Sequence, residues 1–216
     1  PPRSTLFPYT TLFRSVTLGP LSNIALALRQ DPGIAGLVSR CVVMGGAATA
    51  WGNTNPVAEF NIWCDPESAR IVFRSGMPVE MVGWELCMNE YALTPPEIEA
   101  LYALKPLGEF SVSCNKKGMA LIEQHLGAQA MLLPDAVTMA VALDPSIVQE
   151  MGQHYVDIET RSELTRGMTV VDRLNLAERE DNRHTWAEVL ESGHRTGVVW
   201  KLDAARWKAM LLDLLR

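Results

Sequence analysis

Short apolar runs alternate with amphipathic stretches along most of the chain. The runs CVVM at residues 41–44 and VEMV at residues 79–82 are short and apolar, which predicts buried strands. Between them, Asp65-Pro66-Glu67 is a strong helix start, with an aspartate N-cap, a proline in the first turn and an acid near the positive end of the helix. A strand, a helix and a strand at this spacing are typical of right-handed crossovers in a parallel sheet.

The same alternation extends over the rest of the chain. We expect Ser22 to cap the first helix and Thr94-Pro95-Pro96-Glu97 to open another. Further strands are predicted at residues 16–18, 155–158, 168–171 and 197–202, and further helices at 34–39, over much of 93–133, and at 136–143 and 204–215. No internal repeat or linker interrupts this order. The pattern therefore predicts one α/β domain, a mostly parallel sheet flanked by helices, that covers residues 16–216.

The first fifteen residues do not fit this pattern. PPRSTLFPYTTLFRS has neither helical nor strand periodicity, and it lacks the basic start and apolar stretch of a signal peptide. Residues 5–15 resemble the translation of a common sequencing-library adapter. We interpret residues 1–15 as an artefactual tail, with a disordered tail as the alternative, and expect the natural sequence to begin near Val16, inside a structural element.

Composition and charge narrow the classes of function. The 216 residues are 48% hydrophobic and carry a formal net charge of −6, with no block of Lys or Arg. Nucleic acid is therefore not the expected ligand, because phosphate binding needs clustered basic residues. No stretch approaches the ~20 apolar residues of a membrane span. The four cysteines form no CxxC pair, so we expect reduced structural cysteines in a cytoplasmic protein, with Cys41 and Cys87 buried.

The polar loop after residue 44 is the most unusual segment. It contains GNTNPVAEFN, which places Asn53, Glu59 and Asn61 just beyond a buried strand, where open α/β sheets bind ligands. Two amides and a carboxylate match the donors and acceptors of a polyhydroxyl ligand. The alternative is a solvated loop whose Asn and Gly residues only form turns, and composition alone favours this alternative.

Asp135 is an acid within an apolar segment, LLPDAV. Such an acid at a helix start is usually an N-cap, and the residues alone favour that role. It is also a candidate ligand for a hard cation such as Ca²⁺, which prefers carboxylate and carbonyl oxygens. The chain has no GxSxG, GxGxxG or GxxxxGK[ST] motif, and its four histidines have no metal-ligand spacing.

Several segments, taken in order, resemble the inosine-uridine-preferring nucleoside hydrolases. They are TLGPLSNIALAL, VVMGG, the GN at residues 52–53, AEFNIWCDPESARIVF, PDAVTMAVALDP and RGMTVVD, and together they extend from about Val16 to the end of the chain. The resemblance implies an open, Rossmann-like sheet with the site at the strand ends. It also implies a Ca²⁺ cofactor and hydrolysis of the N-glycosidic bond of ribonucleosides by a calcium-activated water.

The resemblance also implies roles for particular residues. The backbone carbonyl of Leu18 and the carboxylate of Asp135 match calcium ligands of the family. Asn53, Glu59 and Asn61 match the residues that hold the ribose hydroxyls, and Met44 matches a residue that lines the same pocket.

Two departures from the family pattern change these expectations. The DxDxxxDD cluster, which in the family supplies the catalytic aspartate and most calcium ligands, is absent and would lie upstream of Val16. We therefore expect the amino-terminal portion to be missing and the 216 residues to be inactive. Pro134 stands where many members have a histidine that protonates the leaving base, so the resemblance assigns no leaving-group acid and no base preference.

Two other interpretations remain open at this level. One is a non-catalytic relative that binds a nucleoside or a sugar, and the other is an unrelated α/β protein, such as a sugar-binding domain, in which the polar loop is structural. The hydrolase interpretation predicts a cytoplasmic enzyme of nucleoside salvage. Its expected partners are a small ribonucleoside and further copies of the chain, without nucleic acid or membrane.

Overall fold

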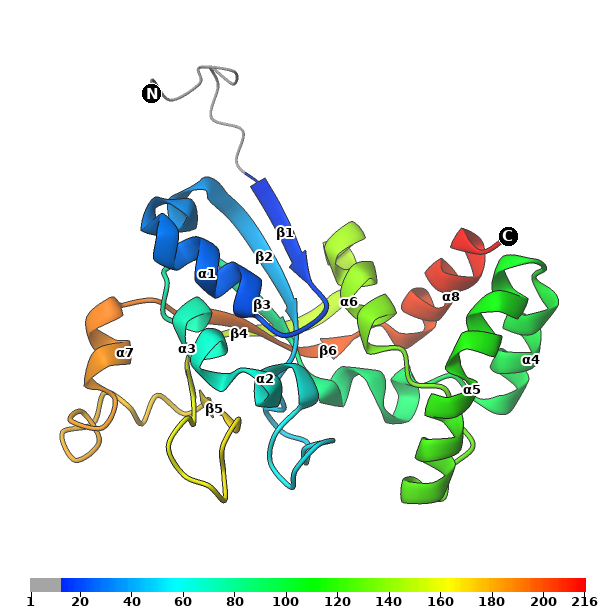
Figure 1. Cartoon of the computed structure of the whole chain (residues 1–216). Coiled ribbons are helices and arrows are strands. Elements are labelled where there is room, and N and C mark those ends of the chain that lie inside the picture. Colours follow the sequence, from blue (N-terminus) through cyan, green and yellow to red (C-terminus); the bar gives the residue numbers. More distant parts are fainter. Residues whose placement is uncertain (1–12) are drawn as a thin grey trace, which may run out of the picture. The chain divides into compact units, whose positions relative to one another are not determined.

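The computed structural model describes residues 13–216 (Figure 1). Residues 1–12 of the predicted artefactual tail lie outside the described residues. The contacts group the chain into two compact units. Unit 1 comprises the chain up to Gly83 together with Gly152–Val198, and unit 2 comprises Trp84–Met151 together with Val199–Arg216. The sequence pattern predicts one domain without a linker, and no Gly- or Pro-rich stretch marks the points where the chain passes between the units.

A six-stranded sheet with the order β1-β2-β3-β6-β4-β5 dominates unit 1, although the ends of β4 and β6 are counted in unit 2. Its strands are β1 (Phe13–Thr17), β2 (Val38–Met44), β3 (Val79–Val82), β4 (Val148–Ile158), β5 (Thr169–Asp172) and β6 (Thr196–Leu202). The pairs β1–β2, β2–β3 and β3–β6 are parallel, while β4–β5 is antiparallel. The predicted α/β fold with a mostly parallel sheet is confirmed.

Strand β1 begins at Phe13, three residues before the strand segment that the sequence predicts at residues 16–18. Residues 14–17 pair in register with residues 40–43, and a register shift lies between Phe13 and Arg14. The Ser39 hydroxyl donates a hydrogen bond of 3.1 Å to the Phe13 carbonyl oxygen. The last three residues of the predicted tail are therefore part of the sheet.

The helices of unit 1 are short. They are α1 (Ser22–Gln30), η1 (Pro32–Leu37), α2 (Phe60–Cys64), α3 (Pro66–Phe73) and α7 (Ala187–Ser192). The predicted cap of α3 is confirmed, because the Asp65 carboxylate accepts a bond from the Ser68 amide. The predicted cap of α1 is wrong: Ser22 lies inside the first turn, and its hydroxyl donates to Asp65 instead. The helix predicted at 34–39 is a 3₁₀ helix that ends before strand β2.

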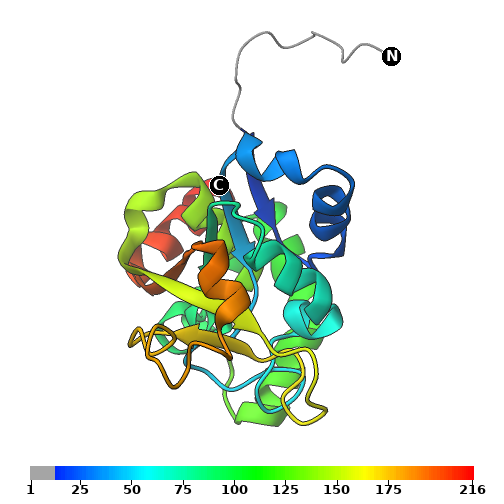
Figure 2. The same ribbon diagram turned by 90° about the vertical axis from the view of Figure 1, so that its left-hand side faces the viewer.

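Helices α1 and α3 pack side by side on one face of this sheet (Figure 1). Helix α7 packs on β4 through Tyr155 and Val189, with Trp186 and Leu190 beside them (Figure 2). Cys41 of β2 is fully buried, as expected, and this burial raises the pKa of its thiol to about 11. At neutral pH this thiol therefore stays protonated and unreactive.

Unit 2 is mostly helical, as predicted for residues 93–133. Its elements are η2 (Trp84–Cys87), η3 (Asn89–Tyr91), α4 (Pro95–Ala103), α5 (Leu107–Leu126), α6 (Pro134–Leu143), η4 (Pro145–Ile147) and α8 (Ala204–Leu214). Thr94 and Glu97 form the capping box of α4. Trp207 is 1% exposed, and its indole N–H donates to the Tyr91 carbonyl oxygen at 3.1 Å. No helix within residues 13–216 has the length and apolar character that a membrane crossing requires.

Candidate functional site

The candidate site of unit 1 begins at the edge of the sheet where the parallel strands end. Thr17, the last residue of β1, lies opposite Val43, and Met44, the last residue of β2, lies opposite Val82. Leu18 and the pair Gly45-Gly46 therefore leave the sheet at the same edge. This is the edge at which open α/β sheets bind ligands.

Glu59 is a buried carboxylate held by backbone amides. It is 2% exposed and is the N-cap of α2. One carboxylate oxygen accepts the Asn61 amide at 2.9 Å, and the other accepts the Gly46 amide at 3.0 Å and the Ile62 amide at 3.4 Å. Charge-assisted bonds of this kind offset the cost of burying an ionised group. The carboxylate thus joins the end of β2 to the start of α2.

Asn61 connects the same two elements through its side chain. It is 7% exposed, and its amide nitrogen lies 3.1 Å from both the carbonyl oxygen and the sulfur of Met44. The solvated-loop interpretation is therefore wrong for Glu59 and Asn61, because a loop of simple turns would leave both in water. Their burial could not be read from composition, since it depends on the bonds that join the start of α2 to the end of β2.

Asn53 behaves differently from these two residues. Its side chain is exposed, and its carbonyl oxygen accepts the Phe60 amide at 2.8 Å and the Thr54 hydroxyl at 3.2 Å. This is the turn-forming behaviour of the alternative interpretation. The bond to Phe60 nevertheless places Asn53 beside Glu59, so the structure brings the four predicted residues Met44, Asn53, Glu59 and Asn61 together in unit 1.

The other predicted residue of unit 1, Leu18, directly follows β1 and is 38% exposed. Its carbonyl oxygen receives no hydrogen bond from the described residues. The neighbouring Thr17 hydroxyl is buried and also has no partner there. An oxygen that the fold leaves unsatisfied is available to a ligand.

Asp135 belongs to unit 2 and lies in the first turn of α6. The N-cap of this helix is Leu133, without a side-chain cap, so the interpretation of Asp135 as an N-cap is wrong. Pro134 occupies the first helical position and moves the acid one place into the helix. Although the residue is exposed overall, partial burial of its carboxylate raises its pKa, and no hydrogen bond or charge within the described chain offsets that effect.

These residues fit a calcium ion in chemistry but not in number. Asp135 and the Leu18 carbonyl supply the oxygen donors that Ca²⁺ prefers, but the ion takes about six to eight of them. Within residues 13–216 no three His, Cys, Asp or Glu side chains gather into a group that could hold a metal. The described residues therefore do not form a complete calcium site.

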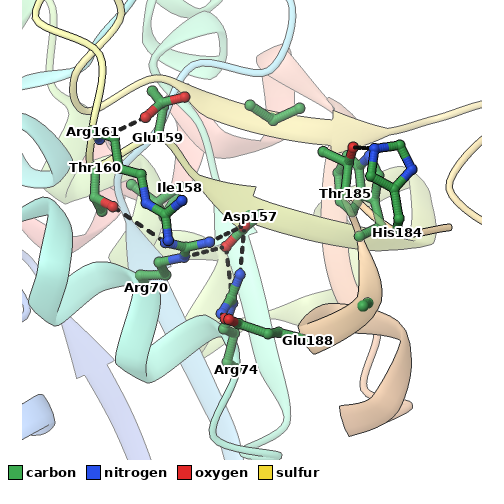
Figure 3. Close-up of a pocket in the computed structure, with 13 residues that line it drawn as sticks. Arg70, Arg74, Asp157, Ile158, Glu159, Thr160, Arg161, His184, Thr185 and Glu188 are labelled. Carbon is green, nitrogen blue, oxygen red and sulfur yellow. Dashed lines mark hydrogen bonds and ion pairs between the residues drawn. The ribbon is translucent and has the colours of Figure 1, made fainter. Parts of the chain in front are cut away.

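A separate hollow of unit 1, with a volume of about 480 Å³, lies between α3, β4 and the segment before α7 (Figure 3). Arg70 and Arg74 both bind the Asp157 carboxylate, at 2.7 to 3.1 Å, and Arg74 also pairs with Glu188. None of the predicted site residues lines this hollow. The sequence does not reveal this network, because its partners are far apart in the chain and form no recognisable motif.

A comparison with protein families shows to which family the chain belongs. The sequence profile described as "Inosine-uridine preferring nucleoside hydrolase" matches residues 10–208. The chain belongs to this family. The motifs that carry the resemblance therefore identified the nucleoside hydrolase family correctly.

Two relatives with curated descriptions are longer than this chain. The pyrimidine-specific ribonucleoside hydrolase RihA of Shewanella baltica (strain OS155) is 39% identical over 203 residues, which is 93% of this chain and 59% of the relative. RihA of Salmonella enteritidis PT4 is 34% identical over 186 residues, which is 82% of this chain and 57% of the relative. The chain thus spans somewhat less than three-fifths of the length of these nucleoside hydrolases.

Solved structures of nucleoside hydrolases have the same fold. The plant nucleoside hydrolase PpNRh1 matches with a TM-score of 0.81 and 26% identity, over 94% of this chain and 61% of that one. An inosine-guanosine nucleoside hydrolase matches with a TM-score of 0.78 and 28% identity, over the same shares.

Proposed function

We propose that the whole protein of which these 216 residues are part hydrolyses the N-glycosidic bond of ribonucleosides. The observation that carries this proposal is the Glu59 carboxylate, buried and fixed by three backbone amides at the ligand-binding edge of the sheet. A ribose that loses its base gains positive charge in the transition state. A negative charge that is already fixed in place stabilises such a state without reorganisation.

The two asparagines offer complementary groups to ribose hydroxyls. The carbonyl oxygen of Asn53 is engaged by the Phe60 amide, which leaves its side-chain NH₂ as a donor. Asn61 is engaged the other way round: its NH₂ binds Met44, which leaves its carbonyl oxygen as an acceptor. One donor and one acceptor suit a pair of hydroxyls, each of which both donates and accepts. Met44 forms the apolar wall beside them.

The proposal includes calcium as cofactor of the whole protein, with the Leu18 carbonyl and Asp135 as two of its ligands. A bound metal ion of this kind lowers the pKa of a water molecule and so generates the nucleophile. Because the described residues offer too few donors, we propose that the 216 residues alone neither bind calcium tightly nor turn over nucleosides.

The test compares two proteins, the whole parent protein and the 216-residue chain. Release of reducing sugar from uridine, cytidine, inosine and guanosine is measured with calcium and after chelation. We expect hydrolysis by the whole protein that chelation abolishes, and none by the 216 residues. Turnover by the short chain contradicts the proposed inactivity, and turnover that survives chelation contradicts the calcium requirement.

A non-catalytic nucleoside- or sugar-binding protein is the alternative outcome of the same test. It would bind ribonucleosides in a calorimeter without releasing sugar. Unchanged binding and turnover in Glu59→Ala and Asn61→Ala variants of the whole protein would instead mean that the polar loop is only structural. The cytoplasmic location, the role in nucleoside salvage and the homo-oligomer stay part of the proposal.

A further inference from the structure

The Glu59–Asn61 segment is supported by a second loop that has no assigned role. Residues 159–168 connect β4 to β5 and are called the hairpin loop here. The loop is closed by two backbone bonds, from the Gly167 amide to the Glu159 carbonyl at 2.8 Å and from the Glu159 amide to the Met168 carbonyl at 3.0 Å. It contains the start of RGMTVVD, a motif that the proposed function leaves without a task.

The hairpin loop is anchored to helix α3. Both terminal guanidinium nitrogens of Arg166 pair with the Glu67 carboxylate, at 2.8 and 2.7 Å, and one of them also binds the Thr160 carbonyl oxygen at 2.6 Å. Arg70 donates to the Thr160 hydroxyl at 3.2 Å, and the same arginine holds Asp157 at the end of β4 (Figure 3). The Arg166 side chain is therefore held by α3 on one side and by the Thr160 end of the hairpin loop on the other.

The anchored hairpin loop packs against the residues on either side of Glu59. Gly167 has a φ of +84°, and a Cβ there would lie 2.9 Å from the Trp63 Cα and 3.1 Å from the Ala58 Cβ. Thr169, directly after the loop, lies against Gly46, whose amide binds Glu59. The space between the hairpin loop and the Glu59 segment is thus filled by backbone and short side chains, which leaves the two segments little room to shift.

One side chain, Asn55, joins the two loops by hydrogen bonds. Its NH₂ donates to the Arg166 carbonyl at 3.0 Å, across 111 positions of sequence. Its carbonyl oxygen accepts the amides of Val57 at 3.0 Å and Ala58 at 2.7 Å, the latter next to Glu59. A single amide group therefore sets the backbone path into Glu59 and attaches it to the anchored hairpin loop.

We propose that Asn55 is a positioning residue, which fixes Glu59 and Asn61 for recognition of ribose hydroxyls by attaching their loop to the Arg166 carbonyl. This inference rests on the proposed function, because it specifies which residue orients the proposed ribose site. Displacing a fixed group by a fraction of an ångström costs more in the transition state than in the bound substrate. The effect is therefore expected mainly in kcat.

Two substitutions separate the attachment from the local turn. Asn55→Asp keeps an oxygen for the Val57 and Ala58 amides but replaces the donor by an oxygen that faces the Arg166 carbonyl. Asn55→Ala removes both functions. Asn182→Asp is the matched control, because its NH₂ also donates to a backbone carbonyl at 3.0 Å in the same unit, at the exposed Leu176 turn.

The functional measurement uses the whole protein and a panel of ribonucleosides with their 2′-, 3′- and 5′-deoxy analogues, at a temperature at which circular dichroism shows every variant folded. We expect Asn55→Asp to lower kcat for ribonucleosides about tenfold with little change in KM. The ratio of kcat for the ribonucleoside to kcat for at least one deoxy analogue should also fall in Asn55→Asp. Asn182→Asp should behave as wild type. An equal loss on all substrates, or none, overturns the proposal.

A second measurement does not depend on activity. Hydrogen exchange of the 216-residue chain gives the exchange rates of the Gly46 and Asn61 amides, which both donate to the Glu59 carboxylate. Asn55→Asp should speed their exchange about tenfold and leave the strand amides of Val43 and Met81 unchanged. If the whole protein does not hydrolyse nucleosides, the proposed function fails. The exchange rates of the Gly46 and Asn61 amides then still test whether Asn55 positions Glu59. Unchanged exchange overturns that role too.

Discussion

At the scale of single residues, Glu59 shows how backbone amides stabilise a buried carboxylate. Its carboxylate binds the backbone amides of Gly46, Asn61 and Ile62. Two of these amides belong to the first turn of α2, where the helix dipole also favours a negative charge. The same carboxylate is therefore part of the fold and of the proposed site.

We expect Glu59→Gln to destabilise the 216-residue chain. The new NH₂ group places a donor against backbone donors, and a buried polar group without a partner costs about 1–3 kcal/mol. Urea denaturation monitored by circular dichroism measures the loss. Glu163→Gln in the same unit is the control, because that side chain is exposed. Equal stability of both variants would mean that the Glu59 bonds contribute nothing.

At the scale of elements, replacing glycine by alanine is expected to change the stability in opposite directions at two positions. Gly167→Ala puts a Cβ against backbone at a φ of +84°, while Gly118 lies within α5 with open space around it. We expect Gly167→Ala to lower the free energy of unfolding by more than about 1 kcal/mol. Gly118→Ala should raise it by roughly 0.5–1 kcal/mol. Thermal denaturation of the two variants measures both, and a stable Gly167→Ala variant would contradict the close packing of the hairpin loop.

The attachment of the hairpin loop to α3 predicts a pH dependence. The hydrogen bonds from Arg166 lower the pKa of Glu67 below its ordinary value of 4.5. The stability that this pair contributes is therefore present above about pH 4.5 and is lost as the pH falls through the lowered pKa. Both side chains are about half exposed, so water limits the contribution to less than about 1 kcal/mol. Glu67→Gln should be less stable than wild type at pH 7 and equal to it at pH 2, measured by urea denaturation.

The sequence predicts most elements of this fold but fewer of its side-chain contacts. Periodicity locates β3 and α8 to within one residue, because both are regular segments with clear boundaries. The caps assigned to Ser22 and Asp135 are wrong, because a neighbouring residue takes the capping position in each case. Asn55 could not be singled out, since its partner Arg166 is distant in sequence and offers only a backbone carbonyl.

At the scale of the whole molecule, helix α5 exposes large apolar side chains. Phe110 is 67% exposed and Leu121 is 52% exposed, and about three helical turns separate them on the same face. Exposed apolar groups that align in this way promote association.

We expect Phe110→Lys combined with Leu121→Lys to raise the concentration at which the 216-residue chain stays monodisperse, because the change removes apolar surface without touching the core. Dynamic light scattering measures this concentration. Val112→Lys is the matched control on the same helix; Val112 is 6% exposed, so its replacement should unfold the region and increase aggregation. No difference between the double variant and wild type would mean that α5 does not drive association.

The structural role of Glu59, together with its proposed role in sugar binding, would constrain how such a protein can diversify. A lineage that exchanged this residue to accept another sugar would at the same moment lose the cap of α2 and its connection to Gly46. Asn53 is less constrained, because its side chain is exposed and its carbonyl oxygen binds Phe60 and Thr54 within the same loop. Natural variation in sugar preference is therefore expected to accumulate at Asn53 first, and at Glu59 only after another residue has taken over its structural task.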